Sequence, residues 1–263
     1  MKINKKTIII ISILLVLIVG GGVTTVLLKG NKSEDKYPEY VKHIKVDNKF
    51  FEGMTEKELL MYKVLNSIDF YKNVSGTYNN FNSDEGEVHY YVDNEKKRTY
   101  IKSNLYEVLV KDNNVVSMEY GRHKVREFAV NDVVDEYIPT LKVKDRIDDE
   151  EQFIGRVDTE YLQQARTTLL NEEEGAYLLR NIGNWEIEWC TYLERDAAKI
   201  ESKMEFESKD GIEKVVYIVD KETGIILEHR RLDKNNNTIY GFETTEIEVD
   251  KGIADEVFDK KLE

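Results

Sequence analysis

The sequence predicts an α+β protein that is dominated by antiparallel β-sheet and preceded by one transmembrane helix. Three observations support this class. Short runs of strand composition follow one another with turn-forming residues between them, no βαβ rhythm of a parallel sheet is present, and a long uncharged run stands near the N-terminus. The chain has 263 residues, of which 41% are hydrophobic and 34% charged, a composition typical of a folded globular body.

The N-terminal run predicts a membrane segment. Residues 7–28 read TIIIISILLVLIVGGGVTTVLL, and about 20 such residues suffice to span a bilayer as a helix. Three Lys within residues 1–6 precede it, which is typical of either a signal peptide or an uncleaved anchor. Because apolar residues continue beyond the three glycines at 20–22, we favour the uncleaved anchor.

This interpretation gives a domain organisation and a location. The short tail before the anchor favours a cytoplasmic N-terminus and a single-pass protein of the cell membrane, with its C-terminal domain extracytoplasmic. The predicted parts are a cytoplasmic tail (1–6), the transmembrane anchor (7–28), a polar juxtamembrane linker (29–50) and the extracytoplasmic domain (51–263).

The first element of that domain is expected to be a helix. Thr55 and Glu58 form a capping-box pattern, which marks a helix N-terminus. The apolar residues that follow fall on one helical face, namely Leu60, Met61, Val64, Leu65 and Ile68.

Strands are expected on both sides of an irregular middle. Five runs form a predicted meander, at 87–93, 98–102, 106–111, 115–120 and 124–130. A helix is expected from about 158 to 170, and the acidic cluster that follows it, Glu172 to Glu174, is expected to be exposed and to bind no metal. Strands resume at 185–192, 198–208, 215–220, 225–232 and 238–249, with turns at 220–224 and 233–237.

No spacing in the sequence indicates catalysis or a cofactor. The four His form no H-E-x-x-H pair, and G-x-S-x-G, P-loop and G-x-G-x-x-G patterns are absent, so each His is expected at the surface or in a turn. The stretch from Asp233 to Asn237 begins like a calcium loop, but Thr238 and Thr244 stand where Gly and Glu are needed. We therefore predict no enzyme, metal or cofactor; a dispersed carboxylate site is the alternative that no spacing supports.

The net charge limits the kinds of partner that the chain can bind, and the cysteine count limits its disulfides. The chain holds 38 Lys and Arg against 51 Asp and Glu, a net charge of −13, and no carboxylate precedes residue 34. The excess of acidic over basic residues argues against binding of nucleic acid or of anionic lipid headgroups through general electrostatic attraction. Cys190 is the only cysteine, so no intramolecular disulfide is possible, and we expect it to be a small buried hydrophobe.

Three apolar residues are the candidates for ligand binding. Trp185, Ile187 and Trp189 alternate with two Glu and so share one face of a predicted strand. We favour packing of these side chains into the core over a role in lining a ligand site, and both interpretations stay open.

The C-terminal half resembles a known superfamily. RDAAKIESK (195–203), VVYIVDKETGIILEHRRLDKNNNTIYGFETTEIEV (215–249) and IADEVF (253–258) are similar to the lipoprotein carriers (LolA-like) and the periplasmic sigma-factor regulator RseB. Asp220, Gly224, Asp233 and Phe258 match the turn and terminal positions of that pattern, while Asn stands at 235–237, where Gly is common. One helix followed by a meander extends the similarity to the front half of the predicted extracytoplasmic domain, and the resemblance implies a bacterial protein.

The resemblance implies a curved, incomplete antiparallel β-barrel with helices packed on its concave side. Carriers of this type hold acyl chains in an apolar hollow, so the implied function is binding of an apolar ligand or a lipoprotein acyl chain. The alternative is a sensor or interaction module that holds a partner membrane protein, as in sigma-factor regulation. A carrier needs a connected apolar hollow, whereas an interaction module can be solid inside and expose a patch.

Overall fold

The computed structural model describes residues 51–130, 155–156, 158–204 and 210–262. The chain divides into two compact units, residues 1–39 and 40–263, and the described residues all belong to the second. The predicted tail, anchor and linker, residues 1–50, lie outside them. No helix within the described ranges combines the length and the apolar character needed to cross a membrane.

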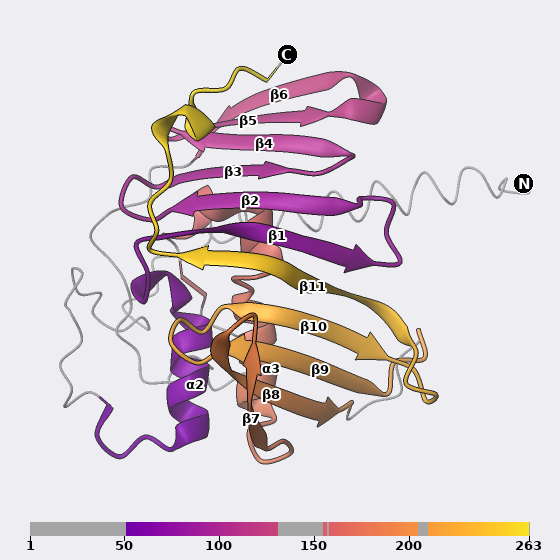
Figure 1. Cartoon of the computed structure of the whole chain (residues 1–263). Coiled ribbons are helices and arrows are strands. Elements are labelled where there is room, and N and C mark those ends of the chain that lie inside the picture. Colours follow the sequence, from indigo (N-terminus) through magenta and orange to yellow (C-terminus); the bar gives the residue numbers. More distant parts are fainter. Residues whose placement is uncertain (1–50, 131–154, 157, 205–209, 263) are drawn as a thin grey trace, which may run out of the picture. The chain divides into compact units, whose positions relative to one another are not determined.

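Eleven antiparallel strands form one open sheet, in the order β6-β5-β4-β3-β2-β1-β11-β10-β9-β8-β7 (Figure 1). Pairing of β1 with β11 joins the N-terminal to the C-terminal strands. The prediction of an α+β protein dominated by antiparallel sheet is confirmed. The strands are β1 (Asn73–Phe81), β2 (Glu87–Asp93), β3 (Arg98–Lys102), β4 (Tyr106–Lys111), β5 (Asn114–Glu119), β6 (Lys124–Ala129), β7 (Ile187–Tyr192), β8 (Arg195–Lys203), β9 (Lys214–Asp220), β10 (Ile226–Leu232) and β11 (Thr238–Val249).

Two α-helices pack together in the described part of the chain, α2 (Glu56–Leu65) and α3 (Glu172–Arg180). Helix α2 begins where the capping box predicted: the Glu58 amide donates to the Thr55 hydroxyl at 3.2 Å, and the Thr55 amide donates to the Glu58 carboxylate at 2.7 Å. The described ranges also contain short 3₁₀ helices, namely η2 (Ser67–Asp69), η3 (Tyr120–Arg122), η5 (Glu160–Thr167) and η6 (Asp255–Phe258).

Both faces of the sheet carry apolar clusters. The main core lies on the face that packs against α2, α3 and η5, which we call the helix face, and it includes Leu65, Val110 and Leu162. The smaller cluster lies on the opposite face, where Phe258 of η6 packs against Tyr100 and Leu109. Alternation along β3 and β4 accounts for this, because neighbouring residues of a strand point to opposite faces.

The turn between β9 and β10 follows the predicted pattern and ties the sheet to α2. The Asp220 carboxylate accepts hydrogen bonds from the amides of Thr223 at 2.7 Å and Glu222 at 3.1 Å. Gly224 has φ +76°, and a Cβ at this position would overlap the backbone of Lys63 in α2. Glycine is therefore required here by both its backbone angle and the close approach of the helix.

Two expectations about the middle of the chain were wrong. The expected helix from 158 to 170 is the shorter η5, which is kinked at Gln163, where φ is 47° and ψ is −124°. The cluster at 172–174 forms the first turn of α3 instead of an exposed loop, and Glu172 and Glu174 are buried. Asn171 caps this helix by accepting hydrogen bonds from the amides of residues 173 and 174, and acidic residues are stabilised at a helix N-terminus.

Candidate functional site

The helices fill only part of the helix face. Two hollows flank η5, and both are bordered by Tyr106 of β4 and Gln164 of η5. We call them the apolar groove, over β4 to β6, and the polar cavity, over β1, β10 and β11. These two hollows are the candidate binding sites of the described chain.

The apolar groove has a volume of about 630 Å³. Leu105, Val108 and Phe128 supply its apolar surface, and Leu105 and Phe128 keep 47% and 49% of their surface exposed. Phe128 lies on the helix face because its cross-strand partner, Val115, belongs to the main core. This aromatic ring therefore points to the side on which a core would form, yet no helix of the described chain covers it.

The rim of the groove is charged. The carboxylate of Glu119 pairs with Arg126 at 3.0 Å and with Arg122 at 3.4 Å. Two guanidinium groups share one carboxylate, so the rim carries a surplus of positive charge. The groove thus combines an apolar floor with a cationic edge.

The polar cavity, about 570 Å³, has a different chemistry. Its inner wall is a buried ionic cluster in which the Glu174 carboxylate accepts hydrogen bonds from the Tyr217 hydroxyl and from Arg231, the latter at 2.6 Å. The His229 ring stacks on Tyr217 with centroids 4.9 Å apart. Burial acts to raise the pKa of Glu174, but the charge of Arg231 and the hydrogen bonds from Tyr217 and Arg231 lower it, and His229 adds to this effect only when it is protonated; the net pKa lies below its ordinary value.

Among the three His that the structure describes, His229 contradicts the expectation that each His lies at the surface or in a turn, while His43 lies outside the described residues. Only 7% of His229 is exposed, because β9, β11 and α3 surround it. Burial, and to a lesser degree the charge of Arg231, lowers the pKa of His229 to about 4, although Glu174 acts in the opposite direction. His229 is therefore uncharged at neutral pH.

Acidification from pH 6.5 to about 4 is expected to destabilise the fold through His229. The unfolded chain, in which the pKa of His is about 6.5, binds the proton first as the pH falls. The stabilisation is complete above pH 6.5 and about 3 kcal/mol of it is lost by pH 4. Urea unfolding at a series of pH values measures this loss.

Two variants isolate the effect of this side chain. His229→Phe keeps an aromatic ring on Tyr217, and it should flatten the dependence of the unfolding free energy on pH between 6.5 and 4.5. His123→Asn, at an exposed turn position, should leave the dependence unchanged. An unchanged slope in His229→Phe would contradict the assignment. Glu174 contributes only below its ordinary pKa of 4.5, outside this window.

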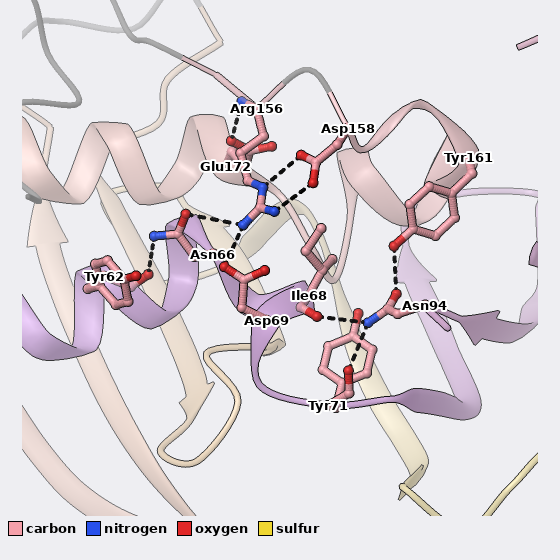
Figure 2. A network of polar contacts seen from close by, with 10 residues as sticks. All are labelled: Tyr62, Asn66, Ile68, Asp69, Tyr71, Asn94, Arg156, Asp158, Tyr161 and Glu172. Atoms are coloured by element: carbon pink, nitrogen blue, oxygen red, sulfur yellow. Dashed lines mark hydrogen bonds and ion pairs between the residues drawn. The ribbon is translucent and has the colours of Figure 1, made fainter. Parts of the chain in front are cut away.

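A buried arginine holds the segment that leads into η5 (Figure 2). The Arg156 guanidinium makes two hydrogen bonds to Asp158, at 2.7 and 2.8 Å, and one to Asp69 at 2.6 Å. Its backbone amide donates to Glu172 of α3 at 3.0 Å. Because Asp69 belongs to η2, just after α2, Arg156 links the segment before η5 to both helices. Sequence reasoning missed this network, since its members are up to 103 positions apart and follow no motif.

The three predicted ligand candidates are not brought together at the hollows beside η5. Trp185 is 2% exposed, and its indole N–H donates to the Leu178 carbonyl of α3 at 2.8 Å. Ile187 packs against the main core, while Trp189 is 43% exposed, with the Lys221 ammonium 4.7 Å from its ring centroid. A ligand-binding role of these three side chains stays a prediction.

The described residues offer little for metal or thiol chemistry. Within them, no group of three His, Cys, Asp or Glu is placed to hold a metal ion. Cys190 is free and half-buried, and burial raises the pKa of its thiol. The sequence did not single out Leu105 or Phe128; the available signal was the aromatic residue in a predicted terminal strand of the meander, 124–130.

No protein-family model matches this sequence, and no curated protein matches it. Solved structures do. An uncharacterized conserved protein from Thermus thermophilus aligns with 8% identity over 79% of this chain and 95% of its own, with a TM-score of 0.43. In the Pseudomonas aeruginosa MucA/MucB complex, the matched chain aligns with 9% identity over 79% of this chain and 62% of its own, with a TM-score of 0.38.

A LolA superfamily protein from Nitrosomonas europaea aligns with 9% identity over 76% of this chain and 97% of its own, with a TM-score of 0.22. The structural neighbours thus include MucB and a LolA superfamily protein, from the two groups of proteins that the sequence resembles. At such identities and TM-scores the likeness concerns the course of the chain and does not extend to function.

Proposed function

We propose that this chain is a membrane-anchored, extracytoplasmic, non-enzymatic protein that binds an apolar ligand, such as an acyl chain, in the apolar groove. The observation that carries the proposal is the open apolar surface around Phe128 on the helix face. Anchoring through residues 7–28 and a sheet that curves as an incomplete barrel are part of the same proposal and rest on the sequence.

The size and lining of the groove favour this ligand class. Its volume of about 630 Å³ suits a small molecule, since ligand sites commonly enclose roughly 300 to 1,000 Å³. Each buried methylene of a chain contributes about 0.8 kcal/mol, so an acyl chain needs few polar contacts to bind. The surplus charge of Arg122 and Arg126 at the rim suits an anionic end of such a chain.

Binding of a fluorescent fatty acid to the unit of residues 40–263 tests the proposal. We expect saturable binding to the unchanged protein. Phe128→Asp should weaken the affinity for the fatty acid by about tenfold or more. The variant places a charged group where burial of the aromatic ring contributes about 1.5 to 3 kcal/mol.

The same strand provides the control. Val125, which is 46% exposed, lies an odd number of positions from Phe128, on the opposite face of the strand, and does not border the groove. Val125→Asp should leave the affinity unchanged. Absence of binding, or an equal loss in the two variants, would contradict a ligand site in the groove.

A second candidate function follows from the edge of the sheet. Within the described ranges β6 pairs only with β5, and every residue of β6 is exposed. Such an edge can accept an added strand from another protein. The chain would then act as a sensor or interaction module that holds a partner membrane protein; a domain that binds no fatty acid would favour this alternative.

A further inference from the structure

Three side chains that line the polar cavity carry oxygen acceptors, while their own N–H or O–H groups already donate elsewhere. The Thr167 and Thr168 hydroxyls both donate to the Gln164 carbonyl, at 3.0 and 3.1 Å, so that only their oxygen lone pairs remain available. The Asn82 amide nitrogen donates to two carbonyls of β11, both at 2.8 Å, which leaves its side-chain oxygen. A ligand that donates hydrogen bonds therefore suits these three acceptors.

The positive charge that borders the cavity is paired within the protein. Among the described residues that border it, Arg231 is the only Lys or Arg, and it pairs with Glu174. Glu85 also borders the cavity and accepts a hydrogen bond from the Asn80 amide. An anionic ligand would meet two carboxylates and no free cation, which disfavours phosphate or carboxylate groups.

Aromatic rings border the same space, and the arginines of β10 lie over two of them. The Arg231 guanidinium is 5.0 Å from the ring centroid of Tyr240, and that of Arg230 is 4.6 Å from the centroid of Phe81. These positions would otherwise suit a ligand cation. Tyr240 still has 39% of its surface exposed, so its ring can pack against an uncharged ligand.

We propose that the polar cavity is a second binding site, which takes an uncharged, hydroxyl-rich ligand of the sugar class. Hydroxyl groups donate to the acceptors of Asn82, Thr167 and Thr168, and the C–H face of a sugar ring packs on Tyr240. A purely apolar ligand would leave these acceptors buried without partners, at a cost in free energy. The site is separate from the apolar groove, so it does not depend on the proposed function.

The test uses the full chain in lipid nanodiscs and three neutral trisaccharides, maltotriose, cellotriose and chitotriose, with binding followed by saturation-transfer NMR and calorimetry. We expect at least one of them to bind saturably with a Kd of about 1 mM or below. Cellotriouronic acid, the carboxylated and anionic counterpart of cellotriose, should bind less tightly than cellotriose itself, because two carboxylates border the cavity.

Variants place the binding. Tyr240→Ala should weaken it at least fivefold, on the order of the contribution of one aromatic contact. Thr167→Val, which keeps the shape of the side chain and removes its oxygen, should weaken it about threefold or more. Phe128→Ala, at an exposed aromatic residue of the apolar groove, is the matched control and should leave the affinity for the trisaccharide unchanged.

The proposal would be overturned by no saturable binding of any of the three trisaccharides, by tighter binding of the anionic trisaccharide, or by affinity that survives both Tyr240→Ala and Thr167→Val. Loss of sugar binding in Phe128→Ala alone would assign the ligand to the apolar groove instead, which also contradicts it.

Discussion

Arg156→Ala is expected to lower the free energy of unfolding by about 3 to 5 kcal/mol, the cost typical of removing one partner of a buried ion pair. The guanidinium lies between two carboxylates, of which Asp158 has only 7% of its side chain exposed and Asp69 has 25% (Figure 2). Without Arg156 these charges stay buried and lose their partner. Urea unfolding followed by tryptophan fluorescence measures the change.

A second arginine nearby provides the control. Arg166 makes one long hydrogen bond, 3.4 Å, to the backbone carbonyl of Arg156, and Arg166→Ala should cost less than about 1 kcal/mol. Adding Asp158→Asn to Arg156→Ala should restore part of the loss, because it removes one uncompensated charge. Equal stability of Arg156→Ala and Arg166→Ala would show that the network contributes little.

Trp185→Ala is expected to lower the free energy of unfolding by about 3 to 5 kcal/mol, as for a large buried aromatic residue. The indole is 2% exposed, and it donates to the last turns of α3 through the Leu178 carbonyl. Far-UV circular dichroism during urea unfolding measures the change, since this variant loses the buried fluorophore. The effect on fatty-acid affinity should be small, because Trp185 does not border the apolar groove.

Trp189→Ala is the matched substitution at the exposed tryptophan. Trp189 has 43% of its surface exposed and lies outside the main core, so its substitution should lower the free energy of unfolding by less than about 1 kcal/mol. A loss of fatty-acid binding in either tryptophan variant, with folding retained, would instead support the ligand-lining role predicted from the sequence. Equal losses of stability in Trp185→Ala and Trp189→Ala would contradict the conclusion that Trp185 is buried in the core and Trp189 is not.

The features that could be predicted from the sequence are local. The capping box at Thr55 and the turn from Asp220 to Gly224 are closed by hydrogen bonds between residues at most four positions apart. Their side chains therefore indicate the structure directly. Ten of the eleven strands were expected for the same reason, since turn-forming residues delimit them.

The strand that was missed shows what local patterns leave out. Strand β1 has the sequence NVSGTYNNF, which is polar and contains Gly76, yet it lies between β2 and β11 and connects the two groups of strands. A Cβ at Gly76 would overlap the Glu246 carbonyl of β11. The glycine is explained by close approach of a strand 170 positions away, which no local pattern reveals.

The buried charges beside the polar cavity could not be predicted from the sequence either, because they also depend on contacts between residues far apart in the chain. Glu174 stands in an acidic run, and such runs are usually exposed, but Arg231 lies 57 positions further along the chain and meets it at 2.6 Å. His229 is buried by the same tertiary contacts. Neither pairing follows from spacing, so the candidate sites could be located only once the strands were in place.

Native mass spectrometry of residues 40–263, purified without detergent from a bacterial host, tests the central claim most directly. The account predicts a copurifying apolar species near one per domain, or saturable uptake of added fatty acid to that level, and its loss in Phe128→Asp but not in Val125→Asp. A mass that shows protein alone, unchanged by added fatty acid, would contradict the proposal that the apolar groove binds an acyl chain.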